Sequence, residues 1–356
     1  MIRLDGSYCE GGGQIVRTAL ALSALTQQPF EIDDIRKGRC SAGLKSQHLY
    51  CVNALQELCN AKAEGNLLGS QSIKFYPGKI EGKEISIDIG TAGSVTLLLQ
   101  ALLLPCMFAD KKTTLRIKGG TDGKWAMPFD YFKEVFLPHI RDFAEIELKL
   151  VNRGYYPKGG GEIELGISPI YKLNRYDNFS KLLEHLRKQK KEFNLIEQGK
   201  LVRIEGVSHA SSRLKKSKVA ERQAVAAKER LKQLDVPVNI RTEYCDTLSA
   251  GTGIVLWGIF WNNKQRIGAD SLGELGKKAE TVGAEAAERL INEINYKAPV
   301  DEYLADNLVP FLALFHGKIK VAKISNHALT NIYIVEKFLG KVFDVDKEKR
   351  IIRAIE

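Results

Sequence analysis

Residues 10–26, EGGGQIVRTALALSALT, show the pattern that recurs along the whole chain. Three glycines lead directly into an apolar run with the period of an α-helix, which we expect over residues 13–26. The next elements are expected in the order strand, helix, strand, strand, at residues 29–35, 44–59, 73–76 and 85–89. This order describes one α/β unit.

The same order of elements occurs twice more. In the second unit the expected elements lie at residues 95–109, 114–118, 129–143, 146–151 and 162–167. In the third unit they lie at residues 303–315, 318–324, 328–339, 342–345 and 350–354. An internal repeat of this size predicts three similar α/β modules that pack together.

The segment between the second and third units does not follow this order. It contains strand patterns at 201–206, 238–242 and 253–261 and helix patterns at 218–233 and 275–295. We therefore expect a smaller α/β domain, residues 181–298, inserted into a large domain made of residues 1–180 and 299–356. An exposed loop is the site at which a chain best tolerates such an insertion.

The net charge of +10 is concentrated in one part of the chain. The segment from Lys181 to Lys232, here called the basic segment, has fifteen Lys and Arg, six Glu and no Asp. A focused positive charge attracts polyanions such as RNA. A solvated, lysine-rich helix face is the alternative interpretation.

The sequence gives no sign of a membrane or secreted protein. No apolar run reaches the roughly 18 residues of a membrane span, and the N-terminus matches neither a signal peptide nor a transit peptide. We expect a cytoplasmic protein. The six cysteines form no CxxC pair and no cluster at zinc spacing, so we expect them to be reduced and structural. A disulfide would be compatible with a thermophilic host.

The glycine-rich turn at residues 10–14 is a candidate anion site. Consecutive glycines let backbone amides approach an anion, and the helix that follows offers unpaired N–H groups at its start. Arg17 lies one turn into this helix, where a cation is unfavourable unless an anion arrives. Glu10 could hold a divalent metal that bridges phosphates. A simple turn with a surface arginine is the alternative, since the pattern is neither Walker A nor GxGxxG.

Two further turns carry polar residues of the same kind. IRKGR at residues 35–39 suits recognition of a phosphate, and Gln47 and His48 follow on the next helix. An exposed basic turn is the alternative. GTAGS at residues 90–94 again joins a strand to an apolar helix, in which Gln100 needs hydrogen-bond partners among leucines.

The last candidate is the segment SNHALTN at residues 325–331. Ser325 or Asn326 would cap a helix and place His327 in its first turn. This position favours the neutral, nucleophilic imidazole over the imidazolium, and it also attracts a phosphate. A structural histidine at a helix start is the alternative.

Taken together and in this order, these segments resemble the RNA 3'-terminal phosphate cyclase family over essentially the whole chain. The resemblance implies a large domain of three βαβαββ-like repeats, similar to the C-terminal domain of bacterial translation initiation factor three, with a smaller inserted α/β domain. The segments that carry it are LDGSYCEGGGQIVR (4–17), IRKGRCSAGLKSQHL (35–49), IGTAGSVTLLLQ (89–100), GGTD (119–122), RGYYPKGGGE (153–162), EYLADN (302–307) and SNHALTNIYIVEKFLG (325–340).

The resemblance also implies roles for individual residues. His327 matches the histidine that takes AMP from ATP, Arg17 and Arg39 match positions close to the phosphates, and Glu10 matches the carboxylate that binds Mg²⁺ or Mn²⁺. The implied ATP-binding residues are Gln47, His48, Gln100, Tyr303, Leu304, Ala305, Asp306 and Asn307. Asn307 departs from the glutamine usual in the family, which shortens the amide by a methylene and leaves its role open.

The implied reaction has three steps. His327 attacks the α-phosphorus of ATP, the adenylyl group passes to an RNA 3'-phosphate as an RNA-ppA anhydride, and the neighbouring 2'-OH closes the 2',3'-cyclic phosphate and expels AMP. The implied partners are therefore ATP and RNA 3'-phosphate ends, while a homodimer is left open.

Three alternatives compete with this interpretation. A catalytically silent relative that serves ribosome assembly would lack the histidine. An enolpyruvyl transferase on a similar repeat fold would not need residues 325–331. Generic RNA binding through the basic segment explains only the charge.

Overall fold

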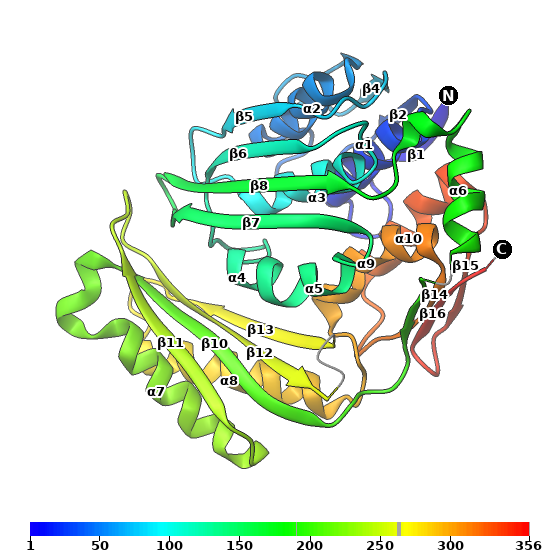
Figure 1. Cartoon of the computed structure of the whole chain (residues 1–356). Coiled ribbons are helices and arrows are strands. Elements are labelled where there is room, and N and C mark those ends of the chain that lie inside the picture. Colours follow the sequence, from blue (N-terminus) through cyan, green and yellow to red (C-terminus); the bar gives the residue numbers. More distant parts are fainter. Residues whose placement is uncertain (190, 262–264, 356) are drawn as a thin grey trace.

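The computed structural model describes residues 1–189, 191–261 and 265–355 (Figure 1). The elements of the first unit are β1 (Ile2–Asp5), α1 (Gln14–Thr26), β2 (Phe30–Asp33), α2 (Ser46–Cys59), β3 (Lys62–Glu64) and β4 (Ile73–Tyr76). Its sheet has the strand order β1-β2-β4-β3. β1 is parallel to β2, and the other neighbours are antiparallel.

The second unit repeats this topology. Its elements are β5 (Glu84–Asp88), α3 (Val95–Cys106), β6 (Thr113–Gly119), α4 (Phe129–Tyr131), a π-helical segment (Phe132–Phe136), α5 (Leu137–Ile140), β7 (Ala144–Asn152) and β8 (Gly161–Pro169). The strand order is β5-β6-β8-β7, again with one parallel pair at the start. The helix expected at 129–143 is therefore divided into three short pieces.

The third unit completes the repeat, although its first strand is far from the rest in sequence. Its elements are β9 (Phe193–Leu195), α9 (Glu302–Phe315), β14 (Gly317–Lys320), α10 (Asn326–Leu339), β15 (Phe343–Asp346) and β16 (Ile351–Ala354). The order β9-β14-β16-β15 matches the first two sheets, and β9 is parallel to β14. The predicted fold class, three βαβαββ units with an inserted α/β domain, is confirmed.

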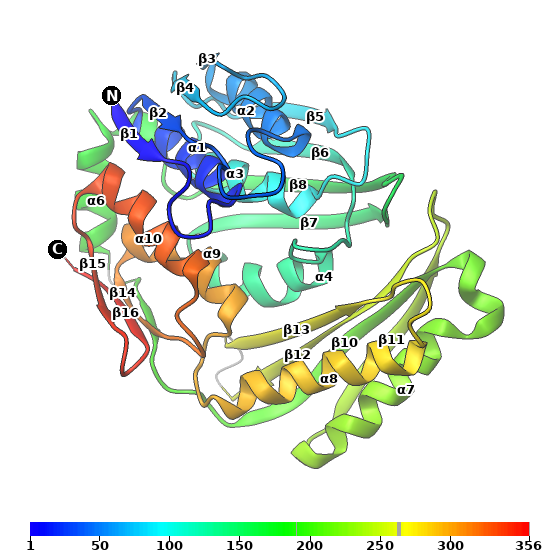
Figure 2. The same cartoon turned by 180° about the vertical axis from the view of Figure 1, so that it is seen from behind.

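A fourth sheet lies between β9 and α9 in the chain. It is built from β10 (Leu201–Ser211), β11 (Val238–Cys245), β12 (Thr252–Phe260) and β13 (Arg266–Leu272), with the helices α7 (Val219–Leu231) and α8 (Ala279–Asn295). Both helices cover the face of the sheet that points away from the three units (Figures 1 and 2). Side chains alternate along β12, so that Ile254 and Leu256 pack under these helices while Val255 and Trp257 join the large core.

The chain does not leave the large core at residue 181. The helix α6 (Phe179–Lys188) buries Leu182 and Leu186 in that core, and Phe193 of β9 follows them. The second core begins only with β10. The domain limits at 181 and 298 stay a prediction, and we propose that the first limit lies after Leu195.

The central helices explain where the functional segments meet. Every residue of α1 is buried, as is nearly every residue of α3, which is typical of helices enclosed by other elements. α1 packs against α3 and α10, and α10 packs against α9. The starts of α1 and α10 lie side by side, because Gln14 of α1 contacts His327 of α10. Among the described residues, none of the helices combines the length and apolar character needed to cross a membrane.

Candidate active site

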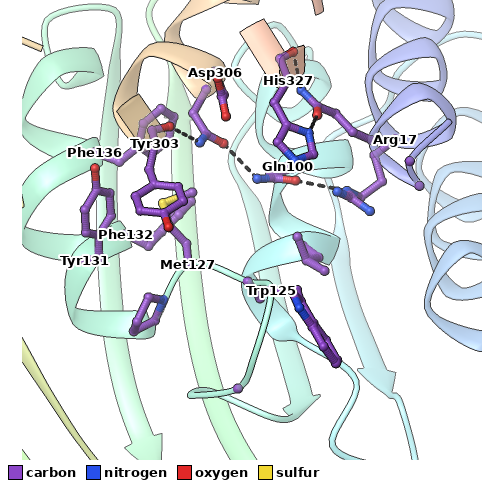
Figure 3. A pocket seen from close by; sticks show the side chains of 18 of the residues that line it. Arg17, Gln100, Trp125, Met127, Tyr131, Phe132, Phe136, Tyr303, Asp306 and His327 are labelled. Atoms are coloured by element: carbon purple, nitrogen blue, oxygen red, sulfur yellow. Dashed lines mark hydrogen bonds between the residues drawn. The ribbon is translucent and has the colours of Figure 1, made fainter. Parts of the chain in front are cut away.

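A cleft of about 1160 Å³ opens where the three units meet the inserted sheet. Its lining comes from the turn before α1, the middle of α3, the loop between β6 and α4, one face of α9 and the start of α10 (Figure 3). The inserted part contributes residues of β13 and α8. The cleft thus gathers segments that are far apart in the sequence.

His327 lies in the first turn of α10, as predicted. Ser325 caps this helix, because its Oγ accepts a hydrogen bond of 2.9 Å from the backbone N–H of Ala328. The Nδ1 atom of His327 lies 2.5 Å from Oε1 of Gln14, at the start of α1. The same Gln14 amide donates through Nε2 to the backbone carbonyl of His327, at 3.1 Å.

These two contacts determine the tautomer of His327. A carbonyl oxygen only accepts hydrogen bonds, so the NH₂ group of Gln14 must face it, and the Gln14 oxygen must face Nδ1. Nδ1 therefore carries the proton, and in the neutral ring the lone pair belongs to Nε2. The His327 side chain is 45% exposed, and Nε2 lies 3.3 Å from Oε2 of Glu10.

Glu10 and Arg39 form the second part of the site. Arg39 donates through Nε to the backbone carbonyl of Glu10, at 3.0 Å, and its Nη2 lies 3.3 Å from the Glu10 carboxylate. Glu10 therefore stands between a guanidinium and the imidazole of His327, with its side chain 36% exposed to the cleft. A single accessible carboxylate beside a phosphate site is a usual way to hold Mg²⁺, so Glu10 fits the metal-binding role.

His48 supports the glycine-rich turn and does not line the cleft. Its ring is fully buried, and a Cβ added at Gly13 would lie 2.0 Å from its Nε2, so only glycine fits there. Its Nδ1 accepts a hydrogen bond from the backbone N–H of Lys45. Burial, together with the nearby cation Arg17, lowers the pKa of His48 to about 3, which keeps this ring neutral. Gln47, its neighbour, does line the cleft.

A chain of side-chain hydrogen bonds crosses the floor of the cleft (Figure 3). Arg17 donates through Nε to Oε1 of Gln100, at 2.9 Å, and Gln100 donates through Nε2 to Oδ1 of Asn307, at 2.8 Å. Asn307 in turn donates to the backbone carbonyl of Tyr303, at 2.7 Å. The chain links α1, α3 and α9, and it gives the Gln100 amide the partners that its apolar sequence context requires.

The charge of Arg17 is not balanced. Its side chain is 7% exposed, and burial lowers its pKa to about 10. No carboxylate forms an ion pair with Arg17 within the part of the chain that the structure describes. A buried cation without an anion is costly, and a ligand phosphate would supply the missing charge.

Asp306 forms hydrogen bonds with residues at the start and in the middle of α10, the helix that carries His327. Its carboxylate accepts a hydrogen bond from Ser325, and its backbone carbonyl accepts one of 2.5 Å from Asn331. Asn331 also accepts from Thr18 of α1, at 2.8 Å. Burial raises the pKa of Asp306 to about 8, so its proton is held far more tightly than usual.

The predicted run from Tyr303 to Asn307 is divided by the period of α9. Tyr303, Asp306 and Asn307 line the cleft, whereas Leu304 and Ala305 are fully buried in the large core on the other side of the helix. The structure therefore brings together three of the five, along with Glu10, Arg17, Arg39, Gln47, Gln100 and His327.

Sequence reasoning did not assign a role to several residues of the cleft. Gln14 stands in the glycine-rich segment, but its contact with His327 spans 313 positions, and no local pattern shows it. Met127 and Phe132 form an apolar end beside Tyr303, and Trp125 lies at the open side (Figure 3). The tryptophan shortly after the GGTD turn was the available signal in the sequence.

A second polar cluster lies between the second unit and the inserted sheet. Asp122, Asp130 and His209 are close enough to surround a metal ion. The buried guanidinium of Arg153 already lies 3.0 Å from Asp122 and 2.6 Å from Asp130, and it also pairs with Glu243 of β11. Because Arg153 supplies the positive charge, this cluster does not fit a metal and instead joins the two parts of the protein.

The basic segment is distributed over several elements. Its first residues lie on α6, and many of its charges are paired, as in the bidentate contact of Arg222 with Glu280. Lys215, Lys216 and Lys218 are exposed together at one end of the inserted sheet, and none is in an ion pair with another described residue. Lys190 lies outside the described residues.

The fold and the cleft define an α/β repeat protein in which one cleft gathers a histidine, a carboxylate paired with Arg39, and the buried Arg17, which has no carboxylate partner among the described residues. The family model for RNA 3'-terminal phosphate cyclase matches residues 8–345, and the chain belongs to this family. The resemblance found in the sequence is thereby confirmed.

Relatives named RNA 3'-terminal phosphate cyclase match over nearly their full lengths. The protein of Pyrococcus furiosus is 45% identical over 97% of this chain and 95% of its own. The relative from Archaeoglobus fulgidus is 42% identical, covering 99% of this chain and 100% of its own. The relative from Saccharolobus islandicus is 43% identical, covering 98% of this chain and 97% of its own.

Proposed function

We propose that the protein is an ATP-dependent RNA 3'-terminal phosphate cyclase that works through a covalent adenylyl group on His327. The observation that carries this proposal is the fixed tautomer of His327, which leaves the Nε2 lone pair facing the cleft beside Glu10. The names of the relatives support the overall reaction.

The two ends of the cleft suit the two ends of ATP. The phosphates would lie at the starts of α1 and α10, where Arg17 and Arg39 supply positive charge. The adenosine would lie at the apolar end, beside Tyr303 and Phe132. Glu10 would hold the divalent metal, Mg²⁺ or Mn²⁺, which neutralises charge on the phosphate oxygens when bound.

In the first step, Nε2 of His327 attacks the α-phosphorus, a P–N bond forms, and the P–O bond to pyrophosphate breaks. Gln14 keeps the accepted hydrogen bond from Nδ1, so it stabilises the positive charge that develops on the ring. Arg17 and Arg39 stabilise the charge on the departing pyrophosphate.

In the second step, an oxygen of the RNA 3'-phosphate attacks the same phosphorus, the P–N bond breaks, and His327 is free again. In the third step, the oxygen of the adjacent 2'-OH attacks the RNA phosphorus, a P–O bond to the 2'-oxygen forms, the P–O bond to AMP breaks, and the proton passes to solvent. AMP leaves and the 2',3'-cyclic phosphate remains. This last step is intramolecular, so the main task of the protein is to position the terminal ribose.

The test is incubation of the protein with ATP, a divalent metal and an RNA oligonucleotide that ends in a 3'-phosphate. We expect a phosphatase-resistant cyclic end and one AMP per RNA. A matched DNA oligonucleotide with a 3'-phosphate lacks the 2'-OH and should stop at the adenylylated stage. A catalytically silent ribosome-assembly protein would produce neither AMP nor a cyclic end, and that result would overturn the proposal.

A further inference from the structure

Trp125 is the most exposed tryptophan of the described chain, and it stands at the cleft rather than on an open face. Its side chain is 93% exposed, and the residue lines the cleft on the loop between β6 and α4. Its φ of +61° lies in the left-handed region, which a bulky residue rarely adopts. Backbone strain of this kind is often found where a side chain has a function.

The loop that carries Trp125 is anchored on both sides. Lys124 forms an ion pair of 3.1 Å with Glu274, just after β13. The backbone carbonyl of Met127 accepts a hydrogen bond of 2.6 Å from Thr96 of α3. The loop is thus tied to the residue after β13 and to α3, while the indole ring is exposed to solvent.

The place of Trp125 separates it from the apolar end of the cleft. In Figure 3 it lies below Gln100 and Arg17, to the right of Met127 and the group around Tyr303. The apolar end has its own aromatic side chains for one base. Trp125 is therefore available to a second base, on the side where Arg17 supplies charge for a phosphate.

Resting on the function proposed above, we propose that Trp125 is a stacking platform for the base of the terminal or penultimate nucleotide of the RNA. An exposed indole stacks on any base, because every base has a π-face, so the contact would give affinity without sequence preference. Single-stranded RNA ends are commonly recognised in this way. Stacking there would orient the terminal ribose and its 3'-phosphate toward His327.

Removal of the Trp125 ring should therefore impair the binding of RNA and leave the reaction with ATP intact. Loss of one base–aromatic stack should weaken RNA binding and raise the KM for RNA by about 5- to 150-fold. Self-adenylylation by ATP without RNA should be unchanged, since the stack does not involve ATP. Replacement by phenylalanine should restore most of the affinity.

The experiment compares Trp125→Ala, Trp125→Phe and the control Trp261→Ala, which removes an 80% exposed tryptophan that does not line the cleft. Affinity for a fluorescent, 3'-phosphorylated RNA is measured by anisotropy, alongside labelling by ATP. A second RNA lacks its last two bases but keeps the backbone. We expect Trp125→Ala and wild type to bind this abasic RNA equally, whereas only wild type binds the intact RNA tightly.

Three results would overturn the inference. The first is equal binding of intact RNA by wild type and Trp125→Ala, and the second is an equal loss of affinity of Trp125→Ala for intact and for abasic RNA. The third is slower labelling of Trp125→Ala by ATP. The last would place Trp125 against ATP. Binding is measured without turnover, so the proposed function is judged separately. A wild type that binds RNA without cyclising it contradicts that function, while the abasic comparison still decides on Trp125.

Discussion

Replacing Arg17 with methionine should stabilise the ligand-free protein while removing its response to ATP. Arg17 is buried at the floor of the cleft, and no carboxylate among the described residues pairs with it. Methionine has a similar length and no charge, so it fits the same space. The change removes a buried cation, and with it the charge that the proposed function uses to bind a phosphate.

The size of the effect follows from the pKa. Burial lowers the pKa of Arg17 from 12.5 to about 10, and a pKa change of one corresponds to about 1.4 kcal/mol, so the charge costs the folded state about 3 kcal/mol. The variant loses the hydrogen bond to Gln100, which offsets about 1 to 2 kcal/mol of this gain. We expect the free energy of unfolding to rise by about 1 to 2 kcal/mol, as for other buried ions replaced by apolar residues.

The assay is denaturant unfolding of the ligand-free protein, repeated with ATP and a divalent metal. The wild type should gain about 2.7 kcal/mol at an ATP concentration one hundred times its Kd, and Arg17→Met should gain little. Arg3→Met, which changes an arginine that is 86% exposed, is the control and should behave as wild type. A ligand-free Arg17→Met protein that is destabilised by more than about 1 kcal/mol would refute the reasoning, because Arg17 would then have a structural partner.

Three further predictions concern other parts of the protein. The folded state holds a proton on Asp306 up to about pH 8, whereas the unfolded chain releases it near pH 3.8, so wild-type stability should fall as pH rises between these values. The free energy of unfolding of Asp306→Asn should exceed that of wild type by at least about 1 kcal/mol at pH 8 and equal it near pH 4. Denaturant unfolding at several pH values measures this, and a difference that does not change with pH would contradict the prediction. Arg153→Met removes the cation that Asp122 and Asp130 share, and it leaves Asp122 beside His209 and Asp130 beside the half-exposed Arg241. The free energy of unfolding should fall by about 3 kcal/mol, and a loss below about 1 kcal/mol would mean that these partners are sufficient. Neutralising Lys215, Lys216 and Lys218 should flatten the salt dependence of RNA binding by about 0.7 per lost phosphate contact and leave ATP labelling unchanged, while an unchanged slope would indicate a merely solvated face.

The repeat could be predicted because each unit has long apolar segments with clear periods. Short elements were missed where the pattern is weak, and the strand expected at 85–89 as the end of the first unit is β5, the first strand of the second unit. β9 has only three residues in a charged context, and it is a strand because it pairs with β14 across the whole insertion. β13 carries Asp270 and Ser271, which obscure its alternation. In both cases the neighbouring strands, rather than the local residues, determine the structure.

The candidate site was predictable where one helix start determines the geometry. Capping rules predict His327 in the first turn and leave Ser325 and Asn326 as possible caps, and the structure has Ser325 as the cap. The partners of His327 depend on how α1 meets α10, which no local pattern contains. Leu304 and Ala305 came from a continuous motif, but a helix turns successive residues to different faces, and these two face the core.

The central claim is that His327 becomes covalently adenylylated through Nε2. The most direct measurement is incubation with α-labelled ATP and a divalent metal, without RNA, followed by a denaturing gel. Wild type should retain a label that acid removes and base does not, as expected for a P–N bond, and His327→Ala should retain none. Gln14→Ala should acquire the label more slowly, because the imidazole of His327 is no longer held in one tautomer. Undiminished labelling of His327→Ala would contradict the account.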